Sequence, residues 1–224
     1  MTEKPSRRKL ILLVAPIVAI TVLGTIASAF TPVLATQHPL LLIALDARNR
    51  MLVLAREVSL VPFVLVALTR RTISDPLFYL LGRNYGEGAV RWLEKKGGAG
   101  GLVTATEKVF AKARYPMVFA FPGAIVCALA GQTGMSPVGF MVTNIAGTIT
   151  SIFMVRTFSA SIASPVEGLL AFFNRNLLVT TLASVVLVAL SFLLNRDSGI
   201  TASIDELESE LEADTSEASG ASES

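Results

Sequence analysis

The chain has 224 residues, of which 52% are hydrophobic and 16% charged, whereas soluble domains average about 25% charged residues. Eight of its 17 acidic residues lie in the last 24 positions, so residues 1–200 carry nine acidic residues against 19 basic ones. A water-soluble globule of this size cannot cover its surface with so few charges, which excludes an ordinary soluble enzyme and indicates a membrane protein.

The first long apolar run covers positions 10–45, which contain no Lys, Arg, Asp or Glu. These 36 positions exceed the length of one membrane crossing, about 20 residues, and are too few for two crossings and a turn. We therefore predict one helix over about residues 10–30 and a re-entrant hairpin over about residues 31–45. Pro39 is expected to be a structural residue of this hairpin, because proline ends helices and restricts the residue before it.

The first helix has a rival interpretation as a secretory signal. The sequence Ala27-Ser28-Ala29 resembles a signal-peptide cleavage site and follows a basic segment and an apolar stretch. That stretch is longer than the usual 7–15 residues, so we expect the first helix to be retained.

The next crossing is predicted over residues 51–68, which are interrupted only by Arg56 and Glu57. The charge-rich segment 72–114 follows, and its helical part is expected to begin at Asp75 and to lie at the cytoplasmic interface. Asp75 is expected to cap that helix, because proline is preferred at the first helical position and Pro76 follows directly. Pairing of Asp75 with a neighbouring base is the alternative.

A second long apolar run covers positions 115–155, 41 residues without Lys, Arg, Asp or Glu. We predict a second re-entrant hairpin over about residues 115–131, with Pro122, Gly123 and Gly131 as its structural residues. Two crossings are predicted beyond it, over about residues 137–155 and 177–194.

The C-terminal tail, residues 197–224, is acidic and has too little apolar content for a core, so we expect it to be disordered and cytoplasmic. Within it, residues 204–211 are able to form a transient helix on a partner.

Orientation follows from the basic residues, which are retained on the cytoplasmic side of membranes. If the basic N-terminus, residues 1–9, is inside, then Arg70 and Arg71 are also inside, Arg48 lies outside, and both termini are cytoplasmic. The two hairpins then enter from opposite faces. We thus expect an all-α helical bundle over residues 10–196 with two oppositely oriented re-entrant hairpins, an inverted repeat typical of secondary transporters. The alternative is a bundle of ordinary short helices without a transport role.

Several residues follow the pattern of a known family. Residues 74–86 fit D-x-x-x-Y-x-x-G-R-x-x-G, and further matches downstream are Phe121-Pro122-Gly123, Ala130-Gly131, Met135, Phe140, Asn144 and Gly147. Over about residues 31–158 the chain resembles the DedA family, also called the SNARE-associated or VTT domain family.

This resemblance implies an integral membrane protein with two opposed re-entrant hairpins that moves lipids between leaflets. Bacterial members are linked to recycling of a polyprenyl-phosphate carrier with proton coupling, and eukaryotic relatives to phospholipid scrambling. The chain departs from the pattern in both hairpins. Thr36-Gln37-His38-Pro39 stands where a proline-glycine-glutamate motif is usual, and no arginine flanks Pro122-Gly123.

Ionisable side chains at membrane depth are costly and are functional candidates by default. We select Glu57 and Arg56 for the translocation path, with snorkelling to the outer interface as the alternative. Arg83 is expected to bind a lipid phosphate through its planar fork, unless it is only an interface residue. His38 could accept a proton in place of the missing acid, although a structural histidine is the commoner case.

The chain lacks the motifs of ATP hydrolysis, zinc proteolysis and serine hydrolysis, so we expect no enzyme, no cofactor and no nucleic-acid partner. One cysteine and one histidine leave no material for a disulfide framework or a Cys/His metal site. We predict a multi-pass plasma-membrane lipid transporter of the flippase or scramblase kind, with an anionic lipid or a polyprenyl phosphate as substrate and protons as a further partner. A non-transporting membrane scaffold or assembly factor is the alternative, and a small-solute channel is a third possibility.

Overall fold

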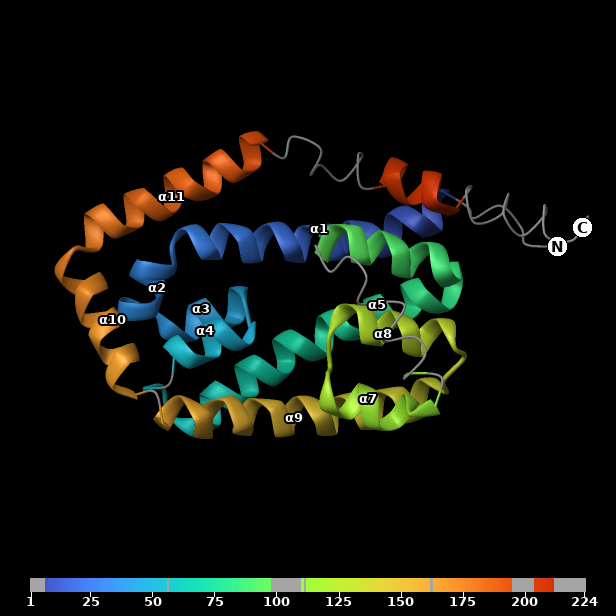
Figure 1. Ribbon diagram of the computed structural model, residues 1–224, viewed down its shortest axis with the longest axis horizontal. Helices are drawn as coiled ribbons and strands as arrows, with labels where there is room; N and C mark the ends of the chain where they lie inside the picture. Colours follow the sequence, from blue (N-terminus) through green and yellow to red (C-terminus); the bar gives the residue numbers. More distant parts are fainter. Residues whose placement is uncertain are drawn as a thin grey trace, which may run out of the picture. The chain divides into compact units, whose positions relative to one another are not determined.

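The computed structural model describes residues 7–55, 57–97, 110, 112–161, 163–194 and 204–211, and these residues form helices and no strand (Figure 1). The all-α prediction is therefore confirmed for this part of the chain. The labelled helices are α1 (Arg7–Ala29), α2 (Thr31–Gln37), α3 (Pro39–Leu45), α4 (Asn49–Leu54), α5 (Leu60–Gly97), α7 (Arg114–Ala120), α8 (Ala124–Gln132), α9 (Pro137–Ser161), α10 (Ala163–Arg175) and α11 (Leu177–Leu194).

Two of these helices are long and apolar enough to cross a membrane, namely α1 over Leu10–Ala29 and α9 over Pro137–Ser159. A third crossing is available if the pair Ala163–Arg175 and Leu177–Ser191, which is bent by 98°, forms one broken span. A chain with two or three such helices is a membrane protein by length and composition.

The chain divides into two compact units, which we describe separately. Unit 1 comprises Met1–Val18, Ser74–Gly147 and Asp197–Ser224. Unit 2 comprises Ala19–Ile73 and Thr148–Arg196.

The crossing predicted over residues 51–68 is wrong. Helix α4 ends at Leu54 and α5 begins at Leu60, with a turn between them. The separate helix start predicted at Asp75 is also wrong, because α5 continues through Pro76 to Gly97 and changes direction only at Gly86, whose φ is 59°. Proline inside a helix removes one backbone hydrogen bond, a loss that membrane helices tolerate when neighbouring groups replace it.

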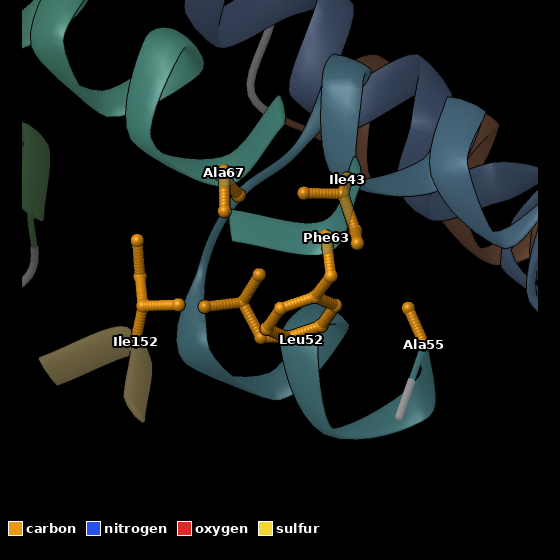
Figure 2. Close-up of a cluster of buried hydrophobic side chains, with 7 residues drawn as sticks. Ile43, Leu52, Ala55, Phe63, Ala67 and Ile152 are labelled. Carbon is orange, nitrogen blue, oxygen red and sulfur yellow. The ribbon is translucent and has the colours of Figure 1, made fainter. Parts of the chain in front are cut away.

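Unit 2 is built around two short helices, α3 and α4, which contact each other and are joined by a turn at residues 46–48. Its core collects apolar side chains from α3, α4, α5 and α9 (Figure 2). The labelled members are Ile43, Leu52, Ala55, Phe63, Ala67 and Ile152. A second cluster joins α1, α2, α3 and α4 through Ala27, Leu34, Ala35, Leu42 and Met51. The two short helices are therefore held by apolar packing on both sides.

The same unit contains α10, a helix that the sequence analysis missed, and α11, which occupies the residues predicted for the last crossing. Both helices contact α2. Large apolar side chains of α11 are exposed, with Leu178 80% and Leu187 67% accessible. This is the surface expected of a helix that faces lipid rather than water.

Unit 1 contains the second pair of short helices, α7 and α8, which also contact each other. Their connection is the non-helical segment 121–123, and the pair occupies the residues predicted for the second hairpin. The unit also holds residues 204–211 of the tail. The tail is predicted to be disordered except for a transient helix over residues 204–211, and these residues are helical, with Ile204 and Leu207 buried. Other parts of the tail lie outside the described residues.

Candidate functional site

Asp75, Tyr79 and Arg83 belong to the DedA-like pattern and follow one another at one helical turn on α5 in unit 1, and Arg83 contacts Tyr79. The Tyr79 side chain is buried, its hydroxyl donates to the Met135 carbonyl at 2.6 Å, and its ring stacks on Phe140 at 4.4 Å. Nη1 of Arg83 donates to the Tyr79 hydroxyl oxygen at 2.7 Å. The Arg83 side chain is exposed, so this bond fixes one end of a guanidinium that still faces outward.

Asp75 does not cap a helix, because it lies inside α5 and is buried. Its Oδ2 accepts a hydrogen bond from Nδ2 of Asn144 at 2.8 Å, and Oδ1 accepts one from the Ser74 hydroxyl at 3.4 Å. The Cys127 thiol donates to Oδ1 of Asn144 at 3.8 Å. A carboxylate that is buried away from water needs hydrogen-bond donors. Ser74 and Asn144 supply such donors, which allows Asp75 to remain buried.

Glycines allow the backbones in this region to approach closely. A Cβ at Gly82 would collide with the Ala128 carbonyl, and one at Gly131 would collide with the Tyr79 carbonyl. At Gly147 the obstacle is the Phe119 carbonyl. Gly123 differs, because its nearest neighbour would be the Phe121 oxygen at 3.9 Å, an ordinary contact. Most of the family-like pattern thus packs α5 and α9 against the α7/α8 pair, as small residues do in membrane proteins.

Unit 2 holds a second polar cluster, at the turn between α3 and α4. The Asp46 side chain is only 4% exposed, and its Oδ1 accepts hydrogen bonds from the backbone N–H of Arg48 at 3.1 Å and from Nε of Arg48 at 2.9 Å. Its Oδ2 is buried and has no hydrogen-bond partner among the described residues. A buried carboxylate oxygen of this kind is rare and requires an explanation.

Two adjacent arginines of α5 complete this cluster. Nη2 of Arg70 donates to the Leu45 carbonyl at 3.2 Å and to the Ile20 carbonyl at 3.4 Å. Nε of Arg71 donates to the Ala47 carbonyl at 3.0 Å. The last carbonyls of a helix lack partners within it and carry partial negative charge, so Arg70 satisfies the C-terminal end of α3, while Arg71 holds the turn that follows it. We call Asp46, Arg48, Arg70 and Arg71 the turn cluster; it combines three positive charges with one negative charge.

The turn cluster corrects the predicted orientation. Residues 46–48 and Arg70–Arg71 are joined by hydrogen bonds, so they cannot lie on opposite faces of the membrane as the basic-residue rule predicted. The sequence signal for this site is an Asp-x-Arg sequence between helices of seven and six residues, each too short to cross the membrane, whereas the sequence predicts that the second of them is part of a crossing over residues 51–68.

The other described site residues that the sequence predicted lie at junctions between helices. His38 is exposed at the junction of α2 and α3, where its backbone N–H bonds the Leu34 carbonyl, and Pro39 is the first residue of α3. Glu57 is exposed in the turn between α4 and α5, and Arg56 lies outside the described residues. Pro122 lies in the connection between α7 and α8. Arg156 of α9 donates to the Val58 carbonyl at 2.9 Å and lies 5.0 Å from the Phe63 ring centre.

Within the described part of the chain, no group of three or more His, Cys, Asp or Glu residues is arranged to hold a metal ion. Searches of family models, of curated proteins and of solved structures find no match to this chain.

Proposed function

We propose that this protein is a lipid transporter of the flippase or scramblase kind, and that the turn cluster binds the anionic head group of its substrate. The substrate class is an anionic lipid or a polyprenyl phosphate. The observation that carries the proposal is the gathering of three guanidinium groups and one buried carboxylate around a break between two short helices.

The depth of the cluster supports this proposal. Arg70 bonds the carbonyl of Ile20, which lies ten residues after Leu10 and nine before Ala29 in the candidate span of α1. If that span crosses perpendicular to the membrane, at about 1.5 Å per residue, Ile20 is near the middle of a hydrocarbon core of about 30 Å. Charges at that depth are expensive and mark substrate pathways in membrane proteins.

The chemistry of the cluster suits a phosphate. Guanidinium groups bind phosphate through parallel N–H donors, and the hydrogen bonds recorded for Arg70 use only its Nη2. Asp46 supplies the opposite charge of the cluster and holds the Arg48 guanidinium in place.

We further propose that α3/α4 and α7/α8 are the two re-entrant hairpins of an inverted repeat, which moves the first hairpin from the predicted residues 31–45 to residues 39–54. Their helices have seven, six, seven and nine residues, whereas a full crossing needs about 20. Broken segments of this kind form the substrate sites of many secondary transporters. Arg83, in unit 1, is proposed as a separate exposed contact for a lipid phosphate. The plasma membrane and cytoplasmic termini remain our proposal for the location, from the basic residues of the N-terminus.

The test is transport by the full-length protein in liposomes, with leaflet access of a fluorescent anionic lipid as the readout. Losing one charge-assisted hydrogen bond of about 1.5–3 kcal/mol should slow transport by roughly tenfold or more, so we expect this loss for Arg70→Gln and Arg71→Gln. Arg175→Gln, which removes an exposed arginine from the last turn of α10, is the matched control and should leave transport unchanged.

A non-transporting scaffold is the second candidate, and one observation favours it. The bonds of Arg70 and Arg71 to backbone carbonyls are sufficient in themselves to explain why these arginines stabilise the turn. If wild-type protein moves no anionic lipid faster than empty liposomes do, the transporter proposal is wrong. If Arg70→Gln lowers only the unfolding temperature and leaves transport intact, the turn cluster is structural and the substrate site lies elsewhere.

A further inference from the structure

A contact unrelated to transport joins the acidic tail to the end of α5 in unit 1. Oε2 of Glu206 lies 2.8 Å from Nζ of Lys96, and Glu210 forms an ion pair with Lys95. Glu206 and Glu210 are four residues apart, so they project from the same face of the helix formed by residues 204–211. Both acids of that face therefore meet the two adjacent lysines.

Apolar contacts accompany these ion pairs. Ile204 is 4% exposed and Leu207 is fully buried. Leu211 lies against Gly88, where an added Cβ would come within 2.9 Å of its Cδ2 atom. On α5, Gly88 and Lys95 belong to one face that also includes Trp92, which is 2% exposed. Residues 204–211 thus contact α5 at Gly88, Lys95 and Lys96, on a helix face that also contains the buried Trp92.

The covered face has the character of a surface that binds anionic membranes. Lysines beside buried apolar residues on a helix are attracted to anionic head groups, and the helix lies at the interface when its apolar face is available. Residues 204–211 carry four acidic residues and no basic one, so they present to this face the same charge that an anionic leaflet would present. Exposed ion pairs are weak, and a charged lipid surface attracts each lysine with comparable strength.

We propose that the Lys95/Lys96 face of α5 is a docking site for an anionic membrane surface and that residues 204–211 occupy it as an internal competitor. Anionic lipid displaces the segment, and zwitterionic lipid does not. This inference is independent of the transport proposal, because it concerns neither the turn cluster nor lipid movement.

Two measurements on the full-length protein in nanodiscs test it. The first uses a spin label on Ser209→Cys in a Cys127→Ser background, because Ser209 is exposed and Cys127 is the only native cysteine. The label should be slow in phosphatidylcholine and several-fold more mobile when phosphatidylglycerol is added at constant ionic strength. The double variant Lys95→Glu, Lys96→Glu should make the label mobile in both lipids, because it removes the positive partners of the segment. Adding Glu206→Lys and Glu210→Lys to that variant restores opposite charges and should restore the slow spectrum in phosphatidylcholine.

The second measurement tests whether lipid takes the place of the segment. In the Glu206→Gln, Glu210→Gln variant, Lys95 and Lys96 should react several-fold faster with a water-soluble acylating reagent in phosphatidylcholine than in phosphatidylglycerol, because anionic head groups protect them. Equal reactivity in the two lipids would overturn the proposal. The proposal would also be overturned if the mobility of the label at position 209 changed neither with the lipid charge nor with the Lys95→Glu, Lys96→Glu substitutions.

Discussion

Asn144 of α9 donates a hydrogen bond of 2.8 Å to the buried carboxylate of Asp75 on α5, joining two residues that are 69 positions apart in the sequence. The same asparagine accepts from the Cys127 thiol of α8. One amide therefore links the three helices that surround the family-like pattern. Removing this amide would leave an ionisable group in an apolar core with one donor fewer.

Asn144→Leu should therefore destabilise the protein by about 2–3 kcal/mol, the cost of leaving a buried charged partner less well satisfied. A lower unfolding temperature in detergent would show this. In the double variant Asp75→Leu, Asn144→Leu both polar groups are gone, and part of the stability should return. If the single variant unfolds at the wild-type temperature, the hydrogen bond does not contribute to stability.

Gly131→Ala should be strongly destabilising, because its Cβ would collide with the Tyr79 carbonyl and backbone atoms cannot move aside as a side chain can. Overpacking of this kind typically costs about 1–3 kcal/mol. Gly168→Ala is the matched control in α10, where an added Cβ meets no atom within 4 Å. Since alanine is favoured over glycine in helices by about 1 kcal/mol, this control should be neutral or stabilising. Thermal unfolding of both variants in the same detergent compares them directly.

Tyr79→Phe tests the contribution of the Tyr79 hydroxyl to stability separately from the lipid binding that is proposed for Arg83. The substitution keeps the ring stacked on Phe140 but removes the hydroxyl that donates to Met135 and accepts from Arg83. We expect a loss of stability of about 1 kcal/mol from the missing hydrogen bonds. If Arg83 contacts the lipid head group, Arg83→Gln should slow transport in liposomes more than Tyr79→Phe does. Equal transport by the two variants would remove Arg83 from the site.

The proposed re-entrant hairpins can be tested by labelling from the two sides of the membrane. Single cysteines introduced as His38→Cys and Ala124→Cys, each in the Cys127→Ser background, lie at an end of α3 and at the start of α8. A membrane-impermeant thiol reagent should reach each of them from one side only, and from opposite sides. Labelling of both cysteines from the same side would contradict the inverted repeat.

The sequence predicted the helical class, the residues of α11 and the residues of the α7/α8 pair, because runs without charge mark apolar helices and clustered Pro and Gly mark their breaks. It failed between residues 46 and 75. There the sequence predicts a hairpin that ends before Asp46 and a crossing that ends before Arg70, whereas long-range hydrogen bonds join the turn after α3 to Arg70 and Arg71 inside unit 2. The positions of uncharged runs in a sequence carry no information on which distant residues form hydrogen bonds with each other.

The functional residues were predicted less well than the helices. Asp75 was expected to be a helix cap from its local sequence, yet its partner Asn144 is distant and decides where it lies. For His38 and Glu57, composition alone selected residues that are exposed and belong to neither cluster. Among the predicted residues, Arg83 has the surroundings that the proposal needs, an exposed guanidinium held by a buried neighbour.

The glycine contacts between α5 and α8 also bear on how this protein could move. At Gly82 and Gly131 the two helices meet backbone to backbone, so no side-chain rotamer is available there to absorb a sliding motion. We expect this pair to behave as one stiff piece within unit 1. At the α3/α4 turn, by contrast, the backbone is held by long arginine side chains, which can change rotamer while keeping their hydrogen bonds. The turn cluster is therefore a place where unit 2 can rearrange without a backbone clash, which is the kind of freedom that the proposed transport would need.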